Sequence, residues 1–276
     1  MKAASMGTLI PLAALALALG CGSESAELAT GPAAPEFQAA ADEPPRYSAW
    51  SAPANLGPVV NTPDVDNDVS VSRDGLSLYF GSNRPGGFGG FDIYVARRSR
   101  VDQPWGAPQN LGPTVNTAAN EQGPALTRDG HRLFLFSDRP GGVGGSDLYV
   151  SRRRGSDELG WEAPANLGSG VNSASNEGLP HYFEDPVSGV ATLYFNSNRP
   201  GYCGGTDIFA ASLQPDGTFG GTVHVPELCS PLRDAGTAIR RDGLEMILSS
   251  DRAGTLGGFD LWVSTRASTG DPWPRL

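Results

Sequence analysis

The stretch SNRPGGFGGFDIYV occupies residues 82–95, and three close copies of it follow along the chain. These are SDRPGGVGGSDLYV at residues 137–150, SNRPGYCGGTDIFA at 197–210 and SDRAGTLGGFDLWV at 250–263. A phosphate-binding or catalytic loop is normally needed once in a protein. In addition, no copy is followed by Lys-Ser/Thr or opens a helix, the features with which such a loop holds a phosphate. The repetition therefore indicates that these glycine-rich loops are architectural.

The loops are one part of a longer unit that repeats at spacings of 54 to 58 residues. The segment WSAPANLGPVVN starts at Trp50 and has close counterparts at Trp105 and Trp161. A divergent counterpart, FGGTVHVPELCS, starts at Phe219, and a fifth start, WPRL, begins at Trp273. A fixed period of this length is typical of repeat folds such as propellers.

Alternating apolar residues and turn signals predict four short strands in each unit. In the first unit, DVSVSRDG closes on an Asp-Gly turn, LSLYFGS and FDIYVARR flank the glycine-rich loop, and WGAPQNLG follows a polar connection. Asp-Gly between apolar runs is a strong hairpin signal, because glycine tolerates a positive φ. Four strands at this period describe a β-propeller blade. We therefore predict an all-β fold, a small β-propeller built from four repeats of about 55 residues, with five blades left open.

To close the ring, the fourth blade needs an outer strand from elsewhere in the chain. The first three blades can take their fourth strand from the segments at Trp105, Trp161 and Phe219. The segment at Trp50 has no strands before it, so we expect this N-terminal strand to close the ring in the fourth blade. Trp273 starts the same strand in the usual order and is the competing candidate.

The residues SRDGLSLYFGSNRPGGFGGFDIYV also resemble the WD40-like β-propeller repeat found in the propeller domain of TolB and in many bacterial envelope proteins. The Asp-Gly turn, the S[ND]RPGG loop and the GG.D[IL][YFW]V strand carry the resemblance, which covers residues 50–276. The resemblance implies a protein-binding or scaffold role and no defined reaction.

The N-terminus is typical of an export signal. The apolar run TLIPLAALALALG is too short to span a bilayer comfortably, and it ends at Cys21. Residues 1–20 resemble a bacterial lipoprotein signal, with lipidated Cys21 as the first mature residue and ordinary secretory cleavage as the alternative. Residues 21–49, rich in Ala, Pro, Glu and Ser, are predicted to be a flexible tether to a propeller at 50–276. These features predict an outer-membrane lipoprotein of a bacterial envelope, on its periplasmic or surface side, attached to the membrane only through the anchor.

The overall charge excludes one class of partner. The chain has 20 basic and 30 acidic residues, a net charge of −10. Binding of nucleic acid phosphates needs a basic face, so no nucleic-acid partner is expected.

Two symmetric sets of charged residues accompany the repeat. One set lies eight residues before each turn aspartate, where it should ring the mouth of the central channel: Asp66, Glu121, Glu177 and Asp234. Four carboxylates facing one axis repel each other unless they are paired. We expect pairing with arginine, with a bound cation such as Ca²⁺ or a partner as the alternative; otherwise no cofactor is predicted and any metal is unknown.

The second set opens and ends each glycine-rich loop. Its members are predicted to form structural loop ion pairs: Arg84 with Asp92, Arg139 with Asp147, Arg199 with Asp207, and Arg252 with Asp260.

Cys203 and Cys229 are predicted to form a disulfide. Cys203 lies in a glycine-rich loop and Cys229 in the connection from the third blade to the fourth, and both should emerge on one face of one blade. The other units have no cysteine at either position, and an oxidising compartment favours the bridge over two free thiols.

No catalytic constellation stands out in the sequence. His131, His181 and His224 have no metal-ligand spacing, and HExxH and GxSxG are both missing. A glycosidase needs two differentiated carboxylates, whereas nearly every acid here has equivalents in other units. The sequence therefore predicts a lipid-anchored propeller that binds an envelope protein partner as a scaffold, without catalysis. The alternative is a carbohydrate-active enzyme or a sugar-binding, lectin-like propeller.

Overall fold

The computed structural model describes residues 51–155, 157 and 159–276. The signal segment, Cys21, the tether and Trp50 lie outside the described residues. Within them, no helix is both long enough and apolar enough to cross a membrane.

The described residues form four antiparallel sheets, one for each repeat. In three sheets the order of the strands follows the chain, from an innermost strand to a short outermost one. The first sheet contains β1 (Asp66–Val71), β2 (Ser77–Ser82), β3 (Asp92–Arg97) and β4 (Gln109–Asn110). The second contains β5 (Glu121–Leu126), β6 (Arg132–Ser137), β7 (Asp147–Arg152) and β8 (Ala165–Asn166).

The third sheet contains β9 (Glu177–Glu184), β10 (Ala191–Ser197), β11 (Asp207–Leu213) and β12 (Phe219–His224). A one-turn 3₁₀ helix, η1 (Pro226–Leu228), leads to the fourth sheet, which contains β13 (Asp234–Ile239), β14 (Glu245–Ser250) and β15 (Asp260–Thr265). We refer to the four sheets as blades 1 to 4.

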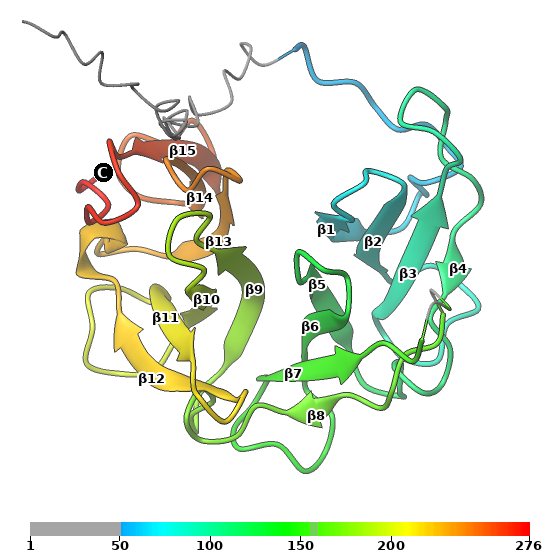
Figure 1. Cartoon of the computed structure of the whole chain (residues 1–276), viewed down its shortest axis with the longest axis horizontal. Coiled ribbons are helices and arrows are strands. Elements are labelled where there is room, and N and C mark those ends of the chain that lie inside the picture. The colour runs from blue at the N-terminus through cyan, green and yellow to red at the C-terminus, as the bar shows by residue number, and fades with distance from the viewer. Residues whose placement is uncertain (1–50, 156, 158) are drawn as a thin grey trace, which may run out of the picture. The chain divides into compact units, whose positions relative to one another are not determined.

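The blades are arranged as a four-bladed propeller, as predicted. The innermost strands contact one another in order, β1 with β5, β5 with β9 and β9 with β13. Figure 1 shows these strands toward the middle of the domain and β4, β8 and β12 at its outside. All four innermost strands have the same register shift soon after their first paired residue, where the innermost strand has one residue more than its partner.

The hydrophobic core lies between neighbouring blades. Blades 1 and 2 share a cluster that includes Tyr79, Ile93 and Trp161, while blades 2 and 3 share one that includes Phe134 and Phe195. Strand alternation explains this arrangement, because successive side chains of a strand point to the two faces of a sheet. Each blade thus contributes one apolar face to each neighbour that covers it.

Blade 4 departs from the expected closure. It has three strands, and residues 51–56 are exposed and pair with no strand of the described domain. Trp273 is instead buried in the core cluster of blades 3 and 4, with Arg266 4.2 Å above its ring. The expectation that the segment starting at Trp50 closes the ring is therefore wrong for its described residues. The physical reason is loop length. Trp273 follows β15 after a short connection, and closing a short loop costs less conformational entropy than bringing the two ends of the domain together.

The glycine-rich loops are structural because close contacts leave no room for side chains. A β-carbon at Gly87 would collide with the carboxylate of Asp92, which the loop surrounds. A β-carbon at Gly89 would collide with the carbonyl oxygen of Ala119, in the connection to the next blade. The loop therefore needs glycine to fold around its aspartate and to contact the neighbouring blade.

Candidate functional site

The four carboxylates predicted to ring the channel mouth are the first residues of β1, β5, β9 and β13. Each is bound by the arginine that opens the glycine-rich loop of its own blade: Asp66 by Arg84 at 2.6 Å, Glu121 by Arg139 at 3.1 Å, Glu177 by Arg199 at 3.1 Å and Asp234 by Arg252 at 2.7 Å. Arginine is therefore the partner of each of the four carboxylates.

Hydroxyl and backbone groups complete the environment of each carboxylate. Glu177 accepts hydrogen bonds from the backbone N–H and hydroxyl of Ser173 and from the hydroxyl of Ser197, and its side chain is fully buried. At Asp66 burial raises the pKa, but hydrogen bonds from Ser82, Arg84 and Thr62 outweigh burial and lower the pKa to about 2. The acidic charge is compensated within each blade, so the ring is a set of four internal ion pairs.

The loop aspartates do not pair with the loop arginines, which corrects the second predicted set. Asp92 accepts hydrogen bonds from the backbone N–H groups of Phe88 and Gly89 and from the amide of Asn110. Asp147 makes the same contacts with Val143, Gly144 and Asn166, Asp207 accepts one from Gly204, and Asp260 accepts one from Leu256. The arginines were assigned the wrong acid because the sequence gives each blade two equivalent carboxylates.

Cys203 and Cys229 form the predicted disulfide, with their Cα atoms 6.0 Å apart. The bridge joins the glycine-rich loop of blade 3 to the connection that enters blade 4.

A cavity of about 590 Å³ opens where the innermost strands of all four blades begin. It leads to a second cavity of about 480 Å³ along the same strands, and both are lined by Asp68, Leu179 and Ser249. We call the two together the axial cavity. Five amide side chains line its wider part: Asn67, Gln122, Asn176, Asn196 and Asn198. Phe136 and Phe259 add two phenyl rings.

Asp68 is the distinctive residue of the axial cavity. It lies at the bulge of β1 with φ 51°, and its counterparts Gly123 (φ 61°) and Leu179 (φ 45°) are also left-handed, so this conformation belongs to the repeat. Burial raises the pKa of its carboxyl to about 6, against which a hydrogen bond from the Gly123 backbone acts only weakly. Raised pKa values of this kind concentrate at functional sites.

Comparison of the repeats with one another could have identified Asp68. The corresponding residues in the other repeats are Gly123, Leu179 and Gly236, so Asp68 breaks the symmetry that the other acids keep. The sequence prediction did not include Asp68 among the candidate residues.

The three histidines lie apart from one another, as their spacing indicates. His131 is in a turn, His224 ends β12, and His181 in β9 accepts a hydrogen bond at Nε2 from the backbone N–H of Ile239. Burial lowers the pKa of His181 to about 4. His181 is therefore neutral and holds β9 to β13.

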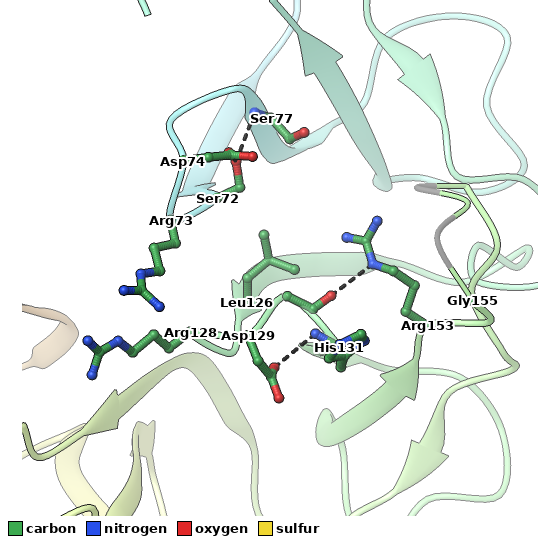
Figure 2. A pocket seen from close by; sticks show the side chains of 11 residues that line it. Ser72, Arg73, Asp74, Ser77, Leu126, Arg128, Asp129, His131, Arg153 and Gly155 are labelled. Carbon is green, nitrogen blue, oxygen red and sulfur yellow. Dashed lines mark hydrogen bonds between the residues drawn. The ribbon is translucent and has the colours of Figure 1, made fainter.

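A cavity of about 580 Å³ lies near the Asp-Gly turns of blades 1 and 2 (Figure 2). Its basic side chains include Arg73, Arg128 and Arg153. Arg153 donates from Nε to the carbonyl oxygen of Gly130, while Asp129 accepts from the backbone N–H of His131. The acids and one of the arginines thus support the turns, and we find no carboxylate pair free for catalysis in this cavity.

No family model and no curated protein sequence matches the chain. Solved structures do match it at the level of fold. TolB from Acinetobacter baumannii is 13% identical, with a TM-score of 0.52 over 78% of this chain and 44% of its own. The α-L-arabinofuranosidase from Lactobacillus brevis is 15% identical, with a TM-score of 0.54 over 75% of this chain and 70% of its own. GH43B of the xyloglucan PUL of Bacteroides ovatus is 16% identical, with a TM-score of 0.50 over 80% of this chain and 42% of its own.

These structures support a TolB-like propeller fold, although the chain spans less than half the length of the TolB and GH43B chains. They also contradict the prediction of a non-catalytic, protein-binding scaffold. That prediction came from the TolB-type repeat alone, yet glycoside hydrolases share the fold as closely as TolB does. The same structures contradict the prediction that the protein is not an enzyme, and they agree better with the carbohydrate-directed alternative.

Proposed function

We propose that the protein acts on carbohydrates, with the axial cavity as the saccharide site and Asp68 as the proton donor to a glycosidic oxygen. The observation that carries this proposal is a carboxyl group with no arginine partner among the described residues, placed in the axial cavity with a pKa raised to about 6. An acid of this kind is still partly protonated near neutral pH, as general acid catalysis requires.

The lining of the axial cavity suits a sugar. Amide groups both donate and accept hydrogen bonds, so Asn67, Gln122 and Asn196 can satisfy hydroxyl groups of either polarity. Phe136 and Phe259 offer apolar faces against which the C–H groups of a sugar ring can lie. A few polar groups among apolar surfaces are typical of small-molecule sites.

A second carboxylate distinguishes a glycoside hydrolase from a protein that only binds sugars. Glycosidases normally use two carboxylates, one as acid and the other as base or nucleophile. Among the described residues that line the axial cavity, the only other carboxylate is Glu177, which is already bound by Arg199 and two serines. This observation favours a second candidate function, saccharide binding without cleavage, in which Asp68 accepts a hydrogen bond from a sugar hydroxyl.

The test is a hydrolysis and binding screen with the purified propeller. Aryl α-L-arabinofuranosides and arabino- and xylo-oligosaccharides are the first substrates, because the fold matches an α-L-arabinofuranosidase. We expect Asp68→Asn to lower kcat about 10²–10⁴-fold, as loss of a general acid does. The matched control is Asp64→Asn, since Asp64 is an exposed carboxylate on the same segment outside the axial cavity.

Calorimetric binding distinguishes the two candidates. Binding without products, weakened by Asn196→Ala, supports the second candidate and overturns the first. If the wild-type protein neither binds nor cleaves any glycan in the panel, both candidates are overturned.

We also propose that Cys21 carries a lipid anchor in a bacterial envelope, supported by the apolar run that ends there. The intact mass of the membrane-extracted protein tests this proposal. A mass that fits an unmodified chain cleaved elsewhere would exclude it, and Cys21→Ser should release the protein from membranes.

A further inference from the structure

Blade 3 departs from the other repeats at three positions that contribute to one place. Cys203 stands where blades 1, 2 and 4 have Phe88, Val143 and Leu256. His224 stands where blades 1 and 2 have Asn110 and Asn166. The hydrogen bonds of the neighbouring residues place Cys229 where they have Asn116 and Asn172, because the connection in blade 3 is one residue shorter. Three unrelated substitutions would not be expected to lie close together in the folded chain.

All three departures surround the loop aspartate of blade 3. Ligand atoms of Cys203, Asp207, His224 and Cys229 lie within 4.8 Å of one another. The Sγ of Cys229 is 3.0 Å from Oδ1 of Asp207, and Nε2 of His224 is 3.9 Å from the same oxygen. Neighbouring ligands of a tetrahedral Zn²⁺ are roughly 3.3–3.8 Å apart, given metal–ligand distances of 2.0–2.3 Å. The four ligand atoms are thus within about 1 Å of the spacing of a zinc centre, except for the two sulfurs, which are bonded to each other and would have to separate.

The hydrogen bonds also distinguish this place from its counterparts. In blades 1 and 2 the asparagine amide donates to the loop aspartate at 2.8 Å. In blade 3 the imidazole that replaces it is largely buried, with 14% of its side chain exposed, and its Nε2 has no hydrogen-bond partner among the described residues. A buried imidazole nitrogen without a partner is available as a metal ligand.

We infer that the reduced form of the protein binds one zinc-class divalent cation through Cys203, Asp207, His224 and Cys229, and that the disulfide is the oxidised form of the same site. The conversion requires a dithiol reductant. The disulfide takes up two electrons and two protons to give two thiols, while the dithiol loses them and becomes a disulfide. Binding of the cation then releases the two thiol protons, because thiolates are the ligands.

The site is separate from the proposed saccharide site. None of its four residues lines the axial cavity. Its test therefore needs no activity, and failure of either proposal leaves the other standing.

The test compares oxidised and phosphine-reduced protein, each incubated with Zn²⁺ and then desalted. We expect about one zinc per chain in the reduced protein and none in the oxidised protein, by elemental mass spectrometry. Co²⁺ substituted for zinc should give the thiolate-to-metal absorption band of a cysteine-ligated centre. Circular dichroism follows the fold: refolding of a reduced, unfolded chain by zinc supports the site, and a chain that zinc neither binds nor refolds overturns it.

His224→Asn is the informative variant, because it restores the residue of blades 1 and 2 and leaves both cysteines in place. We expect its zinc affinity to fall by at least tenfold, while the oxidised variant keeps its disulfide. His131→Asn is the matched control, since His131 lies in an exposed turn. Unchanged zinc affinity in His224→Asn, or an equal loss in His131→Asn, would contradict the assignment.

Discussion

The strands β7 and β15 have nearly the same sequence and the same place in their blades, yet their apolar faces differ. Leu148 in β7 is fully buried against blade 3, whereas Leu261, at the same repeat position in β15, is 74% exposed. Val263 is exposed in the same way. The repeat therefore determines which side chains point toward the neighbouring blade, but not whether a neighbouring blade covers them.

The ion pairs of the same two blades do not differ. Glu121 and Asp234 are both fully buried, and each is bound by the arginine of its own loop. A contact within one blade thus forms in every position of the ring, while a contact between blades forms only where a neighbouring blade is present.

The largest expected effect is loss of an ion pair. Glu121→Gln in blade 2 and Asp234→Asn in blade 4 should each lower the free energy of unfolding by about 3–5 kcal/mol, because each leaves a buried arginine without its counter-charge. Urea unfolding measures both. A much smaller loss in blade 4 than in blade 2 would show that the free face of blade 4 loosens its interior.

The apolar faces should respond unequally. Leu148→Ala is expected to lower the free energy of unfolding by about 2–5 kcal/mol, since it opens a cavity in a packed interface. Leu261→Ala should change it by at most about 0.5 kcal/mol, as for an exposed site. The same urea titration compares the two. A loss of several kcal/mol at Leu261 would mean that blade 4 is covered in solution.

The disulfide should stabilise the junction of blades 3 and 4. The double variant Cys203→Ala/Cys229→Ala is expected to lose about 3 kcal/mol, chiefly because the bridge constrains the unfolded chain, a model-dependent figure. Thermal unfolding of the oxidised wild type and the variant measures the loss. Reduction of the wild type in the presence of a chelator is the control and should produce a similar loss.

The last expected effect belongs to Asp68 and depends on pH. Its folded pKa of about 6 lies above the usual 3.8, so the folded state binds more protons between these values and stability falls as the pH rises through them. Asp68→Asn should therefore be more stable than wild type by about 2–3 kcal/mol at pH 8 and equal to it below pH 4. Unfolding curves at the two pH values measure the difference. An equal difference at both values would indicate that the carboxyl does not titrate in this range.

Much of the fold could be predicted because its causes are local. Asp-Gly turns and alternating apolar residues determine hairpins whatever lies beyond the blade. The pairing of Cys203 with Cys229 also followed from the repeat, because antiparallel strands bring alternate connections to the same end of a blade.

The candidate site could be predicted only in part. The acidic set was located, but its partner was open, because each blade offers two carboxylates for one arginine. Asp68 was missed because it lies two residues from Asp66, an acid that does repeat. Comparison of the repeats would have separated the two, but only the structure shows that Asp68 faces the axial cavity.

The sequence by itself determined the strands, the glycine-rich loops, the disulfide and the number of repeats, since each depends on neighbours within about one unit of chain. Only the tertiary structure decided which terminus fills the last place of blade 4, which carboxylates are neutralised and which one remains in the axial cavity. These depend on contacts between residues far apart in the chain, where closure entropy, burial and the position of an arginine determine the outcome.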